Sequence, residues 1–214
     1  FPWCSKVPVW ASKIYRFRRF SNQFSLFHLS MVAQINGRHG VISRNYIQSL
    51  EPSQEGWPSV LISKDVTHIE ANAFEGSPIG CIGFEEGSVL VEIESFAFRD
   101  SRLESIRIPA SCCWIGDSAF AGTPLKSIFF DTDSKLEIIC ASTFADTLLS
   151  SIRIPASVTE IDALAFANCK LISLAFEHGS RLPKIHSMAF KEASLVLPAS
   201  LEEIGEEAFL GNSI

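Results

Sequence analysis

The side chains able to perform acid–base chemistry are scattered along this sequence. Two histidines stand near a carboxylate: His178 follows Glu177, and His186 lies a few positions before Glu192. Either pair would suit proton transfer if the fold brought it together, although most sequence neighbours of this kind face water. The motifs of a phosphate-binding loop, a dinucleotide-binding turn, a zinc protease and a nucleophile elbow are all missing from the sequence. We therefore expect no catalytic residue and no enzyme activity.

The residues able to ligate a metal also lack a suitable spacing. Six cysteines occur without a CxxC pair: Cys4, Cys81, Cys112, Cys113, Cys140 and Cys169. We interpret them as small, mostly buried apolar residues rather than a disulfide framework. Acidic loops recur at Glu85-Glu86, Asp131 to Asp133 and Glu177, once in about two repeats. Loops two coils apart are separated by about 10 Å, too far to share one Ca²⁺. The sequence predicts no metal and no cofactor, and a solubilising edge in their place.

One group of side chains suits the binding of another protein. Arg107, Phe129 and Arg153 occupy equivalent positions of successive repeats, and arginine and aromatic residues are enriched at interface hot spots. Glu104 and Lys126 border this group, and a row of small residues runs beside it: Ser105, Ser127 and Ser151. Neighbouring parallel strands lie about 4.8 Å apart, so the group forms one compact patch. We expect it on the concave face of a repeat solenoid, the usual binding surface of such folds.

The elements that position this patch follow from an internal repeat. An Ala-Phe pair recurs at steps of 24, 22, 24, 22, 24 and 19 residues, with Thr replacing Ala once; its aromatic residues are Phe74, Phe98, Phe120, Phe144, Phe166, Phe190 and Phe209. An isoleucine stands five residues before every one of them: Ile69, Ile93, Ile115, Ile139, Ile161, Ile185 and Ile204. Further apolar columns give the unit L-x-x-I-x-x-x-A-F-x-x-x-x-L-x-x-I-x-I/F. Each unit exposes too much apolar surface to fold alone, so stacking of about seven units is required.

Two kinds of unit alternate along the chain. One contains Ile-Pro-Ala-Ser, as at Ile108 to Ser111, and the other contains a longer acidic loop, as at Phe84 to Ser88. Segments such as Ile106-Arg107-Ile108 alternate apolar and polar residues, which predicts short strands with one face inward. The Ala-Phe segment follows a polar turn and suits a single helical turn that packs its Phe into the core. The predicted fold is a solenoid of short parallel strands and turns.

These columns closely resemble the BspA-like (Treponema-type) leucine-rich repeat family. The resemblance rests on L-x-x-I-x-x-x-A-F followed by L-x-x-I-x-I-P-A-S and covers about residues 57–214. It implies a curved solenoid with a parallel sheet along one side, in secreted or cell-surface proteins that bind other proteins or host surfaces. The family's Gly before Ala-Phe is kept only at Gly116 and Gly205, and its Cys after the Phe only at Cys169. These departures concern local turn shape.

Residues 1–56 are expected to form a separate, basic N-terminal segment. The first 50 residues hold seven Lys or Arg and no Asp or Glu, which leaves a balance of −13 for residues 51–214. The apolar stretch from Phe24 to Ala33 is compatible with an export signal. Organelle targeting, a cap for the first repeat, a disordered extension and translated non-coding sequence are the alternatives. We place the solenoid at 57–214, beginning near Trp57.

The remaining composition narrows the partners and the compartment. The acidic repeats should repel nucleic acid. The sequence contains no run of 18 apolar residues, so we expect no membrane-spanning helix in it. The chain stops at Ile214 inside a unit, without a polar capping repeat, so we expect a truncated solenoid from a longer protein. The function expected is binding of a protein or cell-surface ligand, in adhesion or recognition at the cell surface or after secretion. A cytoplasmic scaffold is the alternative, and the oligomeric state is left open.

Overall fold

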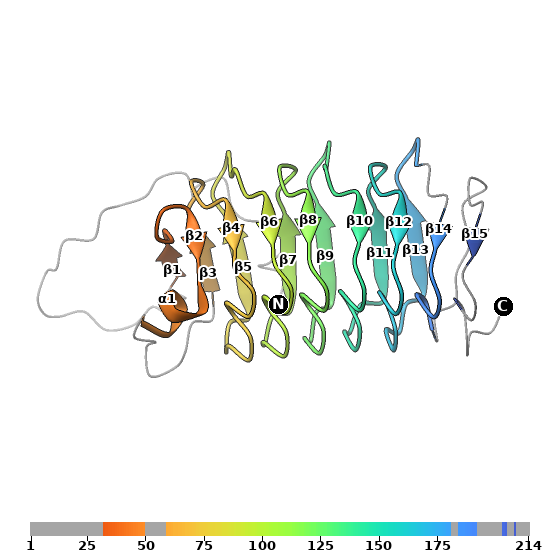
Figure 1. Ribbon diagram of the computed structural model, residues 1–214, viewed down its shortest axis with the longest axis horizontal. Helices are drawn as coiled ribbons and strands as arrows, with labels where there is room; N and C mark the ends of the chain where they lie inside the picture. The colour runs from red at the N-terminus through yellow and green to blue at the C-terminus, as the bar shows by residue number, and fades with distance from the viewer. Residues whose placement is uncertain (1–31, 50–58, 181–183, 192–202, 205–207, 209–214) are drawn as a thin grey trace, which may run out of the picture.

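The computed structural model is a solenoid whose coils stack side by side along one axis (Figure 1). It describes residues 32–49, 59–180, 184–191, 203–204 and 208. Each coil contributes a long strand, a loop, a short strand and the Ala-Phe turn, in that order. The fold predicted from the repeat is confirmed.

The long strands form one side of the solenoid, which we name the long-strand face. These are β1 (Val32–Ile35), β3 (Ser59–Ile62), β5 (Cys81–Phe84), β7 (Ser105–Ile108), β9 (Ser127–Phe130), β11 (Ser151–Ile154) and β13 (Ser173–Phe176). All are parallel to their paired neighbours, in the orders β1-β3-β5-β7-β9 and β11-β13. On β7 and β9 the inward Ile106, Ile108 and Ile128 are buried and Phe130 is half-buried, whereas the alternate Arg107 and Phe129 are exposed. This is the alternation that the sequence predicts.

The short strands form the opposite side, which we name the short-strand face. They are β2 (Val41–Ile42), β4 (His68–Ile69), β6 (Glu92–Ile93), β8 (Trp114–Ile115), β10 (Ile138–Ile139), β12 (Glu160–Ile161), β14 (Lys184–Ile185) and β15 (Glu203–Ile204). They pair in parallel as β2-β4-β6-β8 and β10-β12-β14-β15. Within the described residues, neither the β8–β10 contact nor the β9–β11 contact is a hydrogen-bonded ladder, so the short-strand sheet is interrupted between the coils of β8 and β10 and the long-strand sheet one coil later, between β9 and β11.

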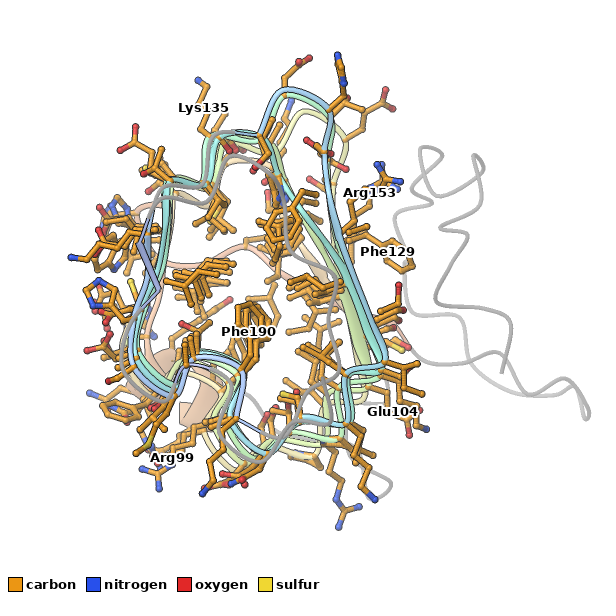
Figure 2. The ribbon with its side chains drawn as sticks, turned by 90° about the vertical axis from the view of Figure 1, so that its right-hand side faces the viewer. Arg99, Glu104, Phe129, Lys135, Arg153 and Phe190 are labelled. Carbon is orange, nitrogen blue, oxygen red and sulfur yellow. The ribbon has the colours of Figure 1, made fainter. Side chains whose placement is uncertain are left out.

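The Ala-Phe turns bridge both junctions without interruption, and across the β9–β11 junction the backbone N–H of Phe144 donates to the Ala165 carbonyl (2.9 Å). The backbone N–H of Phe120 donates to the carbonyl of Thr143 (2.9 Å), as that of Phe98 does to Ala119 (2.8 Å). Inside the turns, six Phe rings stack with centroid spacings of 4.9, 5.2, 5.5, 5.3 and 5.1 Å, and all are fully buried: Phe74, Phe98, Phe120, Phe144, Phe166 and Phe190. In Figure 2 this column lies in the interior of the stacked coils, where Phe190 is labelled. The predicted Phe209 lies outside the described residues.

The solenoid begins earlier in the chain than the sequence pattern indicated. Strand β1 pairs with β3 and β2 pairs with β4, so the parallel ladders start at Val32 rather than near Trp57. After β2, the helix α1 (Arg44–Ser49) takes the place of the Ala-Phe turn, with the Ser43 hydroxyl accepting a hydrogen bond from the Tyr46 N–H (3.2 Å) as an N-cap.

Ile47 occupies the Phe position of this first coil. It lies five residues after Ile42, which pairs with Ile69, and its side chain is 8% exposed. The coil was missed because Tyr46-Ile47 replaces the Ala-Phe pair on which the repeat was aligned. Of the segment 1–56, residues 32–49 therefore form the first coil, in the capping position that was one of the alternatives. The other expectations for that segment concern residues outside the described ranges.

Candidate binding surfaces

The long-strand face presents the three residues singled out from the sequence. Arg107 and Phe129 are register partners on β7 and β9, and Arg153 follows at the same position of β11. All three side chains are exposed, Phe129 to 46% despite its apolar ring. Figure 2 shows Phe129 and Arg153 projecting from the same side of the solenoid. The predicted geometry is therefore present, while the role in binding stays a prediction.

The arginines differ in their electrostatic surroundings. The guanidinium of Arg107 forms an ion pair with Asp131, and the Lys126 ammonium lies 3.0 Å from the Glu104 carboxylate with both side chains 59% exposed. Arg153 forms no ion pair with any of the described residues. Arg153 is consequently available to an incoming carboxylate.

The serine row is less uniform than the sequence suggests. Ser105 is buried, with 8% exposure, Ser127 is half-buried and Ser151 is exposed. Accessibility therefore increases along the row, and contact with a partner is restricted to Ser127 and Ser151. In the same row, Cys81 is disulfide-bonded, which departs from the expectation that the cysteines are merely packed apolar residues.

The face is flatter than the expected concave surface. In the view along the solenoid axis, successive coils overlie one another, and the stack in Figure 1 runs nearly straight. A flat surface of this kind suits a partner that lies across the strands.

Of the two acid–base pairs considered from the sequence, His178 with Glu177 lies within the described residues and forms no ion pair there. His178 is exposed, and the Glu177 carboxylate accepts a hydrogen bond from the Ala156 N–H (3.1 Å). Glu192 lies outside the described residues, and His186 contacts Glu160 of the preceding coil. The hydrogen bond from His186, supported by Lys184 at 3.5 Å, lowers the pKa of the Glu160 carboxyl. The cluster of Glu160, Lys184 and His186 joins residues of two neighbouring coils, and a search for residues close in sequence does not find it.

The buried thiols are poor nucleophiles. Desolvation raises the pKa of Cys112 and of Cys140 to about 12, and it also raises that of Cys169. Neutral thiols at physiological pH neither attack electrophiles nor bind metals well. In the described part of the chain, no group of three or more His, Cys, Asp or Glu side chains is arranged to hold a metal ion. The same residues contain no helix long and apolar enough to cross a membrane.

The sequence reasoning missed a partly exposed apolar pair on the short-strand face. Trp114 on β8 is 41% exposed, and Ile138 on the adjacent β10 is half-buried. Both stand six residues before a column Phe, so the repeat already placed them on adjacent strands. They were overlooked because only the columns after the Phe were searched for binding residues.

Coils of this geometry define a leucine-rich repeat solenoid. Comparison of the chain with known protein families identifies the type of repeat. The BspA type leucine rich repeat region matches residues 55–173 and 164–214, in six copies. The chain belongs to this family. Leucine-rich repeats of this type are protein-interaction modules and are generally not enzymes. Among curated proteins, no sequence matches the chain.

Two solved structures share the fold. The pneumococcal vaccine antigen PcpA is 26% identical with a TM-score of 0.58, covering 74% of this chain and 51% of that one. A leucine-rich repeat protein from Bacteroides ovatus is 19% identical with a TM-score of 0.55, covering 91% and 62%. The chain therefore spans about half of the first protein's length and under two thirds of the second's.

Proposed function

We propose that the long-strand face binds a protein ligand at the cell surface or after secretion, with Arg107, Phe129 and Arg153 as its central contacts. The observation that carries this proposal is Phe129, an exposed aromatic ring flanked on both sides by arginines. Apolar surface of this kind beside charged groups is characteristic of interface hot spots. The family's role in protein interaction and the vaccine-antigen description of one structural relative support the extracellular setting.

The chemistry of the patch selects a particular ligand. Asp131 already neutralises Arg107, whereas Arg153 has no such partner within the described residues. A ligand carboxylate at Arg153, next to an apolar side chain on Phe129, would satisfy both groups. The bordering Glu104–Lys126 pair is exposed and contributes chiefly to orientation, because exposed ion pairs contribute about 0–1 kcal/mol.

The binding role is tested by panning a displayed random-peptide library on the immobilised protein. We expect enriched peptides to carry Asp or Glu close to an aromatic or aliphatic residue. Arg153→Glu should weaken the best peptide by about tenfold or more, whereas Lys126→Glu at the border should change its affinity little. Retained affinity in Arg153→Glu and in Phe129→Ala would dismiss this face as the binding site.

The location is tested separately by antibody labelling of the producing cells. Labelling of intact cells, or recovery of the protein from the medium, is expected. Labelling that requires permeabilisation would contradict an extracellular setting and favour the cytoplasmic scaffold.

A further inference from the structure

The short-strand face has an ordered sequence of outward residues. Register pairing places His68, Glu92 and Trp114 side by side on β4, β6 and β8, and Ile138, Glu160 and Lys184 on β10, β12 and β14. Because β8 and β10 are adjacent, the row reads base, acid, apolar, apolar, acid, base (Figure 1).

The centre of this row is an uncharged window. Trp114 is 41% exposed, Ile138 is half-buried, and the neighbouring Cys113 is exposed. The position two residues after each outward residue is also uncharged in these two coils, where Gly116 and Cys140 stand between Glu94 and Asp162 of the flanking coils. Tryptophan is among the residues most enriched at interface hot spots, so an exposed Trp in such a window marks a docking position.

Carboxylates surround the window. Asp117 and Glu137 are exposed beside it, and the charges of Asp117, Asp162 and Glu160 act on the buried Cys140 at its centre. The basic partners of these carboxylates lie on the outer sides of the row: His68 is 3.8 Å from Glu92, while Lys184 at 3.5 Å and His186 of the following coil both contact Glu160. Within the described residues, no basic side chain of the two window coils forms an ion pair with Glu92 or Glu160.

We propose that this window binds an extended basic segment of another protein, with an aromatic or aliphatic side chain on Trp114 and Ile138 and a Lys or Arg on each of Glu92 and Glu160. The two carboxylates stand three strand spacings apart, about 14 Å. In an extended chain, residues four positions apart point to the same side and span about 13 Å, with the residue midway between them also on that side. The spacing of the row thus matches a basic–x–apolar–x–basic segment.

The charge of the face decides between classes of ligand. Nucleic acid and anionic lipid would meet the surrounding carboxylates and be repelled, whereas a basic peptide is attracted. The proposal concerns the face opposite to Arg107, Phe129 and Arg153 and does not depend on their function.

The test uses the full chain and two blocked peptides, Thr-Lys-Thr-Phe-Thr-Lys-Thr and its counterpart with Glu at both Lys positions. Binding is followed by nuclear magnetic resonance on the indole N–H signal of Trp114, assigned by its loss in Trp114→Phe. We expect saturable binding of the Lys peptide, and binding of the Glu peptide weaker by about tenfold or more.

Three variants complete the test, with binding measured by calorimetry. Trp114→Ala and the double variant Glu92→Gln, Glu160→Gln should each weaken the Lys peptide by about tenfold, at an unchanged circular dichroism spectrum. Phe129→Ala, the matched aromatic truncation on the other face, should leave this affinity unchanged even if the function proposed for its own face fails.

Several results would overturn the inference. These are equal binding of the two peptides, full affinity in Trp114→Ala, or loss of affinity in Phe129→Ala alone. A change of the sedimentation coefficient in Trp114→Ala without a change in peptide affinity would identify a second copy of the chain as the occupant, against the proposal.

Discussion

The Ala-Phe turns and the two sheet faces of the solenoid obey different rules. In the turns, six Phe rings stack at nearly constant spacing and the backbone hydrogen bonds continue across every junction between Phe74 and Phe190. The outward positions of the sheets change from coil to coil, and the two ladders are interrupted at consecutive junctions between coils. Regularity therefore marks the residues that maintain the fold, and the departures from regularity mark the residues available for binding.

The largest loss of stability should come from removing one ring of the Phe column. Phe120→Ala or Phe166→Ala should lower the free energy of unfolding by about 3–5 kcal/mol, because each ring is fully buried between two others. Chemical denaturation measures this change in the free energy of unfolding. Phe129→Ala is the control, since its ring is 46% exposed and should cost far less. Equal losses at Phe120 and Phe129 would refute the distinction between turn and face.

A smaller loss of stability is expected at the position three residues after each column Phe. The Thr123 hydroxyl is buried and donates to the Phe120 carbonyl (2.7 Å), whereas the equivalent Ser101 hydroxyl is buried without a partner in the described residues. Thr123→Ala should cost about 1–2 kcal/mol, and Ser101→Ala about nothing, because only the first loses a hydrogen bond. Thermal unfolding of the pair gives the answer; a greater loss at Ser101 would show that the two coils are wrongly equated.

One substitution in an Ala-Phe turn should increase the stability of the protein. Leu164 has a φ of 59° and is 37% exposed, while Asn72 adopts the same conformation in an earlier coil. Leu164→Asn should stabilise the protein by about 1 kcal/mol, because a bulky side chain is disfavoured at positive φ. The matched variant is Leu148→Asn, where the exposed side chain stands outside the positive-φ positions. A loss of stability in Leu164→Asn would argue against strain at this turn.

The smallest effect concerns pH. The folded state depresses the pKa of Glu160 through its hydrogen bond from His186. The stability contributed by this pairing is therefore present above the ordinary pKa of 4.5 and is lost as pH falls through the lowered folded value. Melting temperatures of the native protein should thus fall more than those of Glu160→Gln when the pH is lowered from 6 to about 3. Parallel decreases in both proteins would count against the pairing.

The inward columns of the solenoid could be predicted because each depends on a strict residue spacing. The isoleucine five residues before the Phe and the Phe itself are buried wherever their side chains are described, from Phe74 to Phe190. The first coil could not be found this way, because Ile47 fills the Phe position with a different side chain. Stacking needs only an apolar group of suitable size there, so sequence similarity is lost while the packing is kept.

The sequence predicts on which face the surface residues lie, but it does not predict which ion pairs they form. Spacing places Arg107 and Arg153 on one face, yet only the structure shows that Asp131, from the loop after the next strand, neutralises Arg107. The contact of His186 with Glu160 likewise joins residues that are 26 apart in the chain. Such pairs depend on side-chain reach between coils, which a column of residue types does not encode.

The most direct test of the contrast between turn and face measures stability and binding in the same variant. Phe129→Ala is assayed for its free energy of unfolding and for affinity to the best peptide from the displayed library. We expect unfolding to change by less than about 1 kcal/mol and affinity to fall by about tenfold or more. Unchanged affinity together with a loss of several kcal/mol in stability would contradict the account, because Phe129 would then belong to the packing of the solenoid and not to its binding surface.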